Sequence, residues 1–466
     1  MAASDTATDT IAAISTPPGR GGIGIVRLSG PQAVSIASQL VRPHQPLEHA
    51  RARLADVLDA GDADGPRIDE AFVTLFAAPN SYTSEDLVEI AAHGSPVVLE
   101  LLLRRALELG ARLAEPGEFT QRAFLAGRLD LTQAEAVRDL IDAQTLTQAR
   151  QAASQMGGAL SRRAAPAKQS LVELIALLEA GIDFAEDDID VTPQAEIARR
   201  IDEITPTLAA LEASFARGRI VHDGLTLAIV GRPNVGKSSL FNRLVERDRA
   251  IVTASPGTTR DLVTERISLG GIPIELVDTA GFREGARELL EEAEQLGIRR
   301  SHEALADAAL VLIVLDATQP LNEEDHRLLA AIEGRPAIVA LNKSDLVKGD
   351  AGSTGTLKSA LSGLPALLTS ALTGDGIAAL REHILSLATG GAAAEPGMLT
   401  NLRQYQAVTT ALSALADAAK ANAGAIPHEM ILLDLYRALW ALDSLTGQTT
   451  SDVILNLIFS TFCIGK

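Results

Sequence analysis

The chain has 466 residues, 47% of them hydrophobic and 3% aromatic, and this length predicts two to four domains with cores of their own. Its 41 Lys and Arg stand against 60 Asp and Glu, and the net charge of −19 excludes a protein that coats nucleic acid through bulk charge, although a local basic surface could still meet RNA. The single cysteine, Cys463, excludes an intrachain disulfide. Without a basic leader or an apolar run of roughly 18 residues, we expect a cytoplasmic protein outside the membrane.

The first 125 residues or so mix short strands and helices. We expect strands at 11–14 and 23–28, a helix at 31–41, strands at 72–76 and 87–91, and a helix at 97–109. No metal-ligand spacing and no nucleophile–base pair stands out in this segment. By themselves, Arg27, Glu89 and Arg128 therefore look like surface or ion-pair residues.

From Gly127 to about Arg219 the pattern is helical. Apolar residues step by four and three along a heptad seam, which demands a facing helix: Ile197, Ile201, Ile204, Leu208, Leu211 and Phe215. Pro206 interrupts the seam, so we expect the helix to kink or restart there.

Residues 225–238 carry the most specific motif. A buried apolar strand ends at Gly231, and Gly231 to Ser238 fits the phosphate-binding loop G-x-x-x-x-G-K-[ST], followed by a helix. Glycines let backbone N–H groups converge on phosphate oxygens at a helix N-terminus. Lys237 would then reach the β- and γ-phosphates, and the Ser238 hydroxyl would bind Mg²⁺.

Further segments follow in the order that a GTPase needs. A strand ends at Asp278-Thr-Ala-Gly281. The Asp278 carboxylate suits the outer Mg²⁺ shell, and the backbone N–H of Gly281 suits the γ-phosphate. Thr259 is the candidate switch residue that closes on Mg²⁺. In Asn342-Lys343-Ser344-Asp345, the Asp345 carboxylate can accept hydrogen bonds from N1–H and N2–H of guanine, a pair of donors that adenine lacks. A backbone N–H at Ser370-Ala371 could meet guanine O6. The ordered set predicts GTP binding and hydrolysis.

More helix follows the nucleotide module, including an apolar stripe over residues 431–442. Helices on both sides of a complete module predict one helical domain with the module inserted into it. We expect a multidomain protein that combines α/β and all-α parts: an N-terminal α+β domain at 1–126, a helical domain at 127–223 and 390–466, and a Ras-like P-loop domain with a mostly parallel sheet at 224–389.

Five motifs, one or more in each expected domain, carry a family resemblance: TPPGRGG at 16–22, PGEFTQRAFL at 116–125, GRPNVGKS at 231–238, GTTRD at 257–261 and FCIGK at 462–466. With them the chain resembles the MnmE (TrmE) family of bacterial tRNA modification GTPases. The resemblance implies an N-terminal folate-binding fold that mediates a homodimer. It also implies a formyl- or methylene-tetrahydrofolate site made of Arg27, Glu89, Arg128 and Lys466, with Arg128 where the family carries lysine.

The same resemblance implies a partner and a reaction. The FAD-dependent protein MnmG would join this chain to install an aminomethyl or carboxymethylaminomethyl group at C5 of the wobble uridine of certain tRNAs. Cys463 resembles a functional thiol of the family, with a catalytic and a merely positional role both open.

Phe282 stands where Ras-like enzymes place the glutamine that positions water. The resemblance implies K⁺ in the place of an arginine finger, held by Asn234, Thr253, Ser255 and Thr258, and a water-orienting role for Glu294. The modules would dimerise in the GTP state. The complete set of expected nucleotide contacts is Asn234, Val235, Gly236, Lys237, Ser238, Ser239, Thr253, Ala254, Ser255, Pro256, Gly257, Thr258, Thr259, Asp278, Thr279, Ala280, Gly281, Asn342, Lys343, Asp345, Ser370 and Ala371.

Two other classes share parts of this pattern. A ribosome-assembly GTPase would also carry GRPNVGKS, but such chains add an RNA-binding or second GTPase module, and residues 390–466 lack a Gly-x-x-Gly clamp. A membrane-remodelling GTPase would need a polybasic or strongly amphipathic lipid-binding segment, which this sequence does not show.

Overall fold

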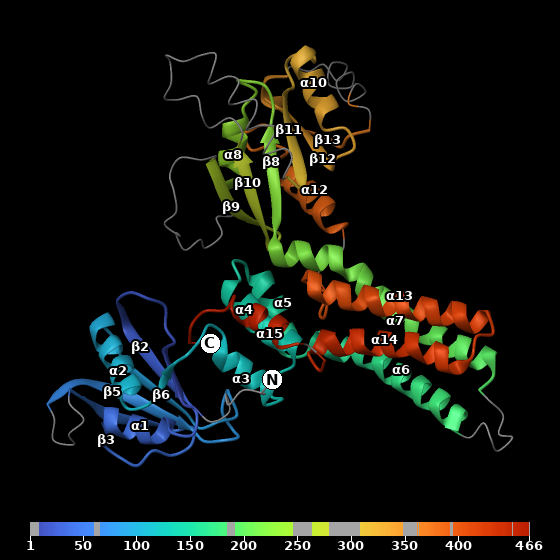
Figure 1. Cartoon of the computed structure of the whole chain (residues 1–466). Coiled ribbons are helices and arrows are strands. Elements are labelled where there is room, and N and C mark those ends of the chain that lie inside the picture. Colours follow the sequence, from blue (N-terminus) through green and yellow to red (C-terminus); the bar gives the residue numbers. More distant parts are fainter. Residues whose placement is uncertain are drawn as a thin grey trace. The chain divides into compact units, whose positions relative to one another are not determined.

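The computed structural model describes residues 9–59, 66–183, 192–245, 263–278, 308–347, 361, 363–391, 395–449 and 451–465. The chain divides into two compact units (Figure 1). The first combines Met1–Arg138, Met156–Gly158 and Trp440–Lys466, and the second combines Asp139–Gln155 and Ala159–Leu439. No helix of the described residues is long and apolar enough to cross a bilayer.

The first unit is built on a seven-stranded sheet in the order β3-β4-β5-β6-β2-β1-β7. The strands are β1 (Ile11–Ile14), β2 (Gly21–Ser29), β3 (Val41–Pro43), β4 (Ala52–Leu58), β5 (Arg67–Phe76), β6 (Leu87–Gly94) and β7 (Arg112–Leu113). Helices α1 (Ala33–Leu40) and α2 (Pro96–Glu108) contribute to the core on one face, and β2 alternates accordingly. Val26 and Leu28 are fully buried there, whereas Arg27 between them points to the other face.

Helical segments from both ends of the chain complete the first unit: α3 (Glu118–Leu125), the start of α4 (Leu131–Asp142), the end of α14 (His428–Thr446) and α15 (Asp452–Phe459). Leu131 and Val137 of α4 share a core with Leu455 and Phe459, so segments more than 300 residues apart in sequence pack together. The rings of Phe124 and Phe459 lie 6.3 Å apart and strengthen this contact.

The helical part of the second unit contains α5 (Leu146–Met156), α6 (Ala159–Asp183), α7 (Gln194–Asp223), α13 (Leu402–Ala423) and most of α14 (His428–Thr446). The heptad seam of α7 is confirmed, because its five aliphatic members from Ile197 to Leu211 are at most 2% exposed. Helices α6 and α13 both pack against α7. The ring of Phe215 stacks on that of Tyr405 at 4.3 Å.

Of the two outcomes expected at Pro206, a kink or a restart, the restart is wrong, because α7 is one helix of 30 residues with Pro206 inside it. The buried seam continues through Ile204 and Leu208 on either side of the proline and holds both halves in register. The Thr205 hydroxyl donates to the Ile201 carbonyl at 2.8 Å, which satisfies one acceptor in this turn.

The nucleotide module has a six-stranded sheet in the order β13-β12-β11-β8-β10-β9. Its strands are β8 (Leu225–Val230), β9 (Val263–Leu269), β10 (Ile272–Asp278), β11 (Leu310–Asp316), β12 (Ala337–Asn342) and β13 (Ala366–Leu368). Every neighbouring pair is parallel except β9 and β10. The α/β fold with a mostly parallel sheet is therefore confirmed.

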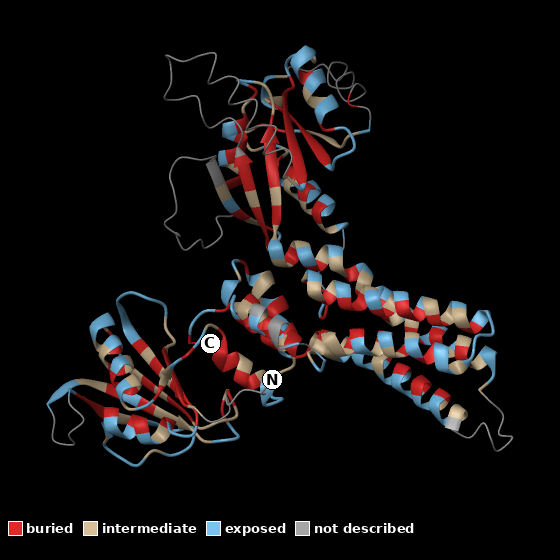
Figure 2. Ribbon diagram, in the orientation of Figure 1, coloured by how far each residue is buried: buried red, intermediate tan, exposed pale blue. Residues whose placement is uncertain are grey.

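Both faces of this sheet are covered, which explains why β11 and β12 are buried along their whole length (Figure 2). Helices α8 (Lys237–Val245) and α12 (Ile377–Thr389) share one core with the sheet, and α10 (Glu323–Ala331) packs on the other. The carboxyl ends of β8, β11, β12 and β13 consequently meet at one edge. In such sheets this edge is where ligands bind.

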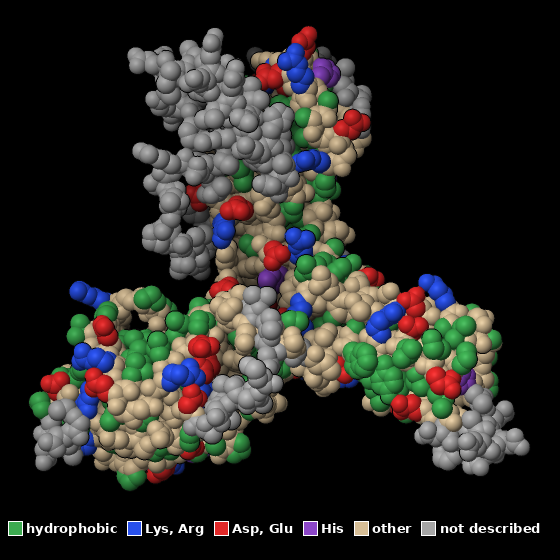
Figure 3. All heavy atoms as spheres, in the orientation of Figure 1, with side chains coloured by type: hydrophobic (Ala, Val, Ile, Leu, Met, Phe, Trp, Pro, Cys, Tyr) green, Lys and Arg blue, Asp and Glu red, His purple; other side chains and the backbone are tan. Residues whose placement is uncertain are grey.

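Charged side chains of both signs are interspersed over the described surface that Figure 3 shows. On that face the acidic residues do not form one continuous patch, so the net negative charge does not exclude local contact with RNA.

Candidate functional site

The phosphate loop lies between the end of β8 and the start of α8 at Lys237. Gly236 has a φ of +95°. A Cβ at this position would lie 2.3 Å from Nδ2 of Asn342, so both the backbone angle and the space require glycine. Asn234 also has a positive φ, 66°, and its side chain is exposed at the loop. The loop has the geometry in which backbone N–H groups at a helix N-terminus bind an anion.

Lys237 is held at this loop by its own backbone. Its Nζ donates to the carbonyls of Gly231 at 2.7 Å and Arg232 at 2.9 Å, and the residue is 8% exposed. Ser238 and Ser239 follow in the first turn of α8 and are exposed. The ammonium therefore lies beside the loop that the sequence assigned to phosphate.

Asn342 joins three loops of the module. Its Nδ2 donates to the Val235 carbonyl at 2.9 Å, and its Oδ1 accepts from the backbone N–H of Ala371 at 3.0 Å. The side chain is buried, and both ends of its amide are satisfied. The Ser370 hydroxyl donates to Oδ1 of Asp345 at 2.6 Å. The structure thus brings together the phosphate loop and the two segments predicted to read guanine.

Lys343 connects this region to the end of β11. Its Nζ lies 2.7 Å from Oδ2 of Asp316, which is 5% exposed. Thr318 donates its backbone N–H and its hydroxyl to the other oxygen, Oδ1, at 2.9 and 2.6 Å. Burial by itself raises the pKa of Asp316, but the hydrogen bonds from Lys343 and Thr318 outweigh it and hold the pKa below its usual value. Sequence reasoning missed Asp316, because no motif marks it.

Arg232 of the phosphate loop contacts the segment after β11. Its Nε lies 3.6 Å from Oδ1 of Asp325 in the first turn of α10, and its Nη2 donates to Oε1 of Gln319 at 3.1 Å. Asp325 is 1% exposed, so this pair is shielded from water on the carboxylate side. The segment from the end of β11 to the first turn of α10 therefore contacts both the phosphate loop and Lys343.

Several predicted site residues lie outside the described residues: Thr253, Ala254, Ser255, Pro256, Gly257, Thr258, Thr259, Thr279, Ala280, Gly281, Glu294 and Lys466. Asp278 is described as the last residue of β10, beside Ile229 of β8, and only its backbone is described. The K⁺ and water-orienting assignments therefore stay predictions.

A second site lies in the first unit. Arg27 and Glu89 are cross-strand neighbours on β2 and β6, and Glu89 Oε1 accepts from Nε of Arg27 at 3.0 Å and Nη2 at 2.7 Å. Arg27 Nη1 donates to the carbonyl of Gly465 in the C-terminal tail at 3.1 Å. Pro116 and Ile464 form a bridge that holds the tail there, with Cys463 exposed beside it.

Glu89 and Arg128 both line a cavity of about 640 Å³. Tyr82 lines it too, and the guanidinium groups of Arg27 and Arg128 lie 5.9 and 5.1 Å from its ring centroid. Burial raises the pKa of Tyr82, whose hydroxyl is 2.9 Å from Oγ1 of Thr120. Sequence reasoning missed Tyr82, and its only signal is an aromatic residue in a chain that has few.

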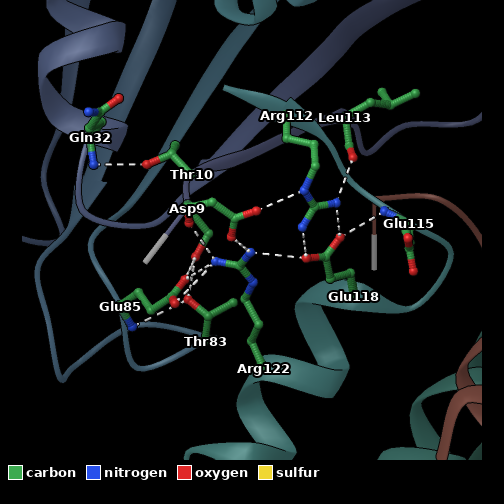
Figure 4. Close-up of polar contacts among 11 residues, drawn as sticks. Asp9, Thr10, Gln32, Thr83, Glu85, Arg112, Leu113, Glu115, Glu118 and Arg122 are labelled. Carbon is green, nitrogen blue, oxygen red and sulfur yellow. Dashed lines mark hydrogen bonds and ion pairs between the residues drawn. The ribbon is translucent and has the colours of Figure 1, made fainter. Parts of the chain in front are cut away.

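Five charged residues next to this region form one ion-pair network (Figure 4). Arg122, which is 7% exposed, donates to Asp9 at 2.6 Å, Glu118 at 3.0 Å and Glu85 at 3.1 Å, and Arg112 bonds both Asp9 and Glu118. Burial favours protonation of Asp9 and Glu118, but the arginines outweigh it and lower the pKa of each carboxyl. The network ties the segment that precedes β1 to α3.

Comparison with known proteins decides the family. The profile of the MnmE helical domain matches residues 131–463, and that of the GTP-binding protein TrmE N-terminus matches residues 10–128. The tRNA modification GTPase MnmE of Koribacter versatilis is 58% identical over 98% of this chain and 99% of its own length. The chain belongs to the MnmE family.

Other MnmE proteins agree with this assignment. The tRNA modification GTPase MnmE of Chloroflexus aurantiacus is 43% identical over 98% of this chain and all of its own length. Among solved structures, the G domain of the T. maritima FeoB iron transporter is 30% identical over 35% of this chain and 98% of its own, with a TM-score of 0.27. As an MnmE family member with a formed phosphate loop, the chain is a GTP-hydrolysing enzyme of tRNA modification.

Proposed function

We propose that this chain uses GTP hydrolysis to support modification of the wobble uridine of certain tRNAs. Together with the FAD-dependent protein MnmG, it adds an aminomethyl or carboxymethylaminomethyl group at C5. The observation that carries the proposal is the presence of two built sites in one chain: a three-loop nucleotide site joined by Asn342, and a cavity beside Arg27 and the C-terminal tail. The full-length match to MnmE proteins favours this function over ribosome assembly.

The cavity takes a tetrahydrofolate one-carbon derivative. Its volume of about 640 Å³ is within the range of small-molecule sites, and its wall offers an aromatic ring, a carboxylate and a guanidinium. Glu89 can accept hydrogen bonds from the donor edge of a pterin, and Arg128 can pair with a carboxylate of the ligand. Arg27 orients Glu89, and Lys466 adds a charge from the tail. The bound folate supplies the one-carbon unit.

In the nucleotide site, Lys237 binds the phosphates and Ser238 with Thr259 holds Mg²⁺. K⁺ binds Asn234, Thr253, Ser255 and Thr258 and stabilises the charge that develops between the β- and γ-phosphates. Glu294 orients the attacking water. The exposed Asn234 side chain at the mouth of the phosphate loop supports the K⁺ site, since an amide oxygen suits a hard cation.

The working unit is a cytoplasmic homodimer formed by the N-terminal domains, with the nucleotide modules meeting in the GTP state. The domain division at residues 126, 223 and 389 belongs to this proposal. Cys463 lies on the C-terminal tail, which Arg27 binds through the Gly465 carbonyl. A catalytic and a positional role of the thiol are both compatible with this place.

Mass analysis of tRNA nucleosides tests the proposal. Cells that lack this protein should lose the C5-modified wobble uridine, and the wild-type chain should restore it. Lys237→Ala, which removes a phosphate ligand, and Glu89→Gln, which alters the cavity, should each fail to restore it. An unchanged nucleoside profile in the deletion strain would refute the tRNA assignment.

A further inference from the structure

Asp316 is the last residue of β11, and its carboxylate forms an ion pair with Lys343, a predicted nucleotide contact. The parallel register pairs Asp316 with Asn342, and the backbone N–H of Ala317 donates to the Asn342 carbonyl at 2.8 Å. This pairing fixes the end of β11 against the first residue of the guanine-reading segment. A carboxylate at this point has one accessible cation from that segment, the ammonium of Lys343.

The geometry holds Lys343 at both ends. Its backbone is in the left-handed region, with a φ of +63°, and its neighbour Ser344 is anchored by an N–H bond to the Thr369 carbonyl at 3.1 Å. At the other end its ammonium lies 2.7 Å from Asp316 Oδ2, and two bonds from Thr318 prevent that carboxylate from rotating. A lysine stem stretched between two fixed points has lost most of the rotamer freedom that a free lysine keeps.

We propose that Asp316 is a positioning residue that tethers Lys343, so that the methylene stem of Lys343 forms a preformed apolar wall for the face of the guanine base. The chemistry needed on this side of a purine is a flat, apolar surface. A four-carbon stem supplies it only when its charged end is directed elsewhere. Asp345 reads the edge of the base, whereas the tethered Lys343 contacts its plane, so Asp316 sets affinity for any purine nucleotide and leaves the choice of base to Asp345.

The position of Asp316 makes the tether strong. The carboxylate is 5% exposed and accepts three hydrogen bonds, one of them charge-assisted, so neutralising it removes the strongest contact and leaves the others. Preorganising a contact surface raises affinity chiefly by slowing dissociation. Loss of the tether should therefore speed release of every purine nucleotide by a similar factor.

Asp316→Asn in the full-length chain, probed with fluorescent GDP and XDP, tests this role. Both nucleotides should dissociate about tenfold faster, while the preference for GTP over XTP stays as in the wild type. Inorganic pyrophosphate, which has no base, should compete with unchanged affinity. Equal losses for GDP and pyrophosphate would overturn the proposal, because they would mean that the module is merely destabilised.

Two further variants separate tethering from general stability. Asp325→Asn changes another buried carboxylate of the same module, in the first turn of α10. Asp325 contacts Arg232 of the phosphate loop, so the effect should fall on GDP and pyrophosphate alike. Lys343→Met keeps an apolar stem and removes the ammonium. In that background Asp316→Asn should no longer speed GDP release. If Asp316→Asn sped GDP release tenfold both in the wild type and in Lys343→Met, the tethering role of Asp316 would be refuted.

Discussion

At the scale of single residues, one amide organises the nucleotide site. Asn342 bonds the phosphate loop on one side and Ala371 on the other, and Gly236 leaves just enough room for it. Because both ends of its amide bond protein groups, the Asn342 side chain holds the loops of the site together. Discrimination of the base must therefore come from its neighbours, and Asp345 is the carboxylate available, held by Ser370 at 2.6 Å.

Replacing Asp345 by Asn should move the nucleotide preference from GTP to XTP. The amide can donate to the C2 oxygen of xanthine, whereas the 2-amino group of guanine would then face a donor. Competition of both triphosphates in a hydrolysis assay measures the ratio, and we expect it to change by about 10³-fold or more. Retained preference for GTP would contradict the guanine assignment, and Glu323→Gln, on the exposed side of α10, serves as a surface control.

At the scale of elements, α7 shows how tertiary packing overrides local propensity. A proline inside a helix costs about 3 kcal/mol because it removes a hydrogen bond and crowds the preceding turn. Helix α7 nevertheless runs through Pro206, since five buried aliphatic residues pack against α6 and α13 on one face. The C-terminal end of α7 is in turn fixed by His222.

Pro206→Ala should stabilise the second unit. Pro206 is exposed, so the change loses no core contact and restores the missing N–H, and we expect a gain of about 1–3 kcal/mol in the free energy of unfolding. Urea denaturation followed by circular dichroism measures it. Ala209→Gly, at an exposed position of the same helix, should lower stability instead, and a destabilising Pro206→Ala would show that the proline geometry is needed.

His222 should make the second unit lose stability at alkaline pH. Its Nε2 lies 3.0 Å from Asp139 and its Nδ1 2.7 Å from Asp223, and these hydrogen bonds, the one to Asp139 first, raise its pKa to about 10. Because the folded pKa exceeds the ordinary 6.5, the stabilisation is complete below pH 6.5 and is lost as the pH rises towards 10.

Unfolding free energies of the wild type and His222→Gln between pH 6 and 10 check this. The difference between the two proteins should shrink as the pH rises. A constant difference across that range would mean that the imidazole charge contributes nothing. His326→Gln, an exposed histidine of α10, is the matched control.

At the scale of the whole molecule, each unit carries its own core and its own site. The first unit is closed by residues from both ends of the chain, because Gly465 accepts hydrogen bonds from Arg27 and from Ser15. The nucleotide site lies wholly in the second unit.

GTP hydrolysis by the intact protein should be fast in K⁺ and slow in Na⁺ at equal ionic strength. A monovalent cation that replaces an arginine finger should contribute roughly 10³–10⁵ in rate, the range that such a finger supplies. Asn234→Ala should remove the difference between the two salts while fluorescent GDP still binds. Equal rates in both salts would exclude the cation mechanism, and choline chloride at the same ionic strength controls for salt.

Sequence motifs suffice to predict the nucleotide site because its chemistry depends on local spacing. Gly231 to Ser238 and Asn342 to Asp345 each follow an apolar strand, and parallel strands bring their carboxyl ends to one edge. The family resemblance, four of the seven N-terminal strands and the heptad seam were predictable in the same way, since each rests on a motif or on a period. Strands β3, β4 and β7 were not predicted.

Tertiary structure alone decided the rest. The tether joins Asp316 and Lys343, which are 27 positions apart, and the network around Arg122 brings in Asp9, which is 113 positions away. Two arginines distant in sequence also lie near the ring of Tyr82, and no motif marks any of these contacts. Such contacts depend on which strands pair and which faces pack. Pro206 shows the converse: local chemistry allowed a kink or a restart of α7, and the packing of the buried seam on both sides of the proline explains why the helix does not restart.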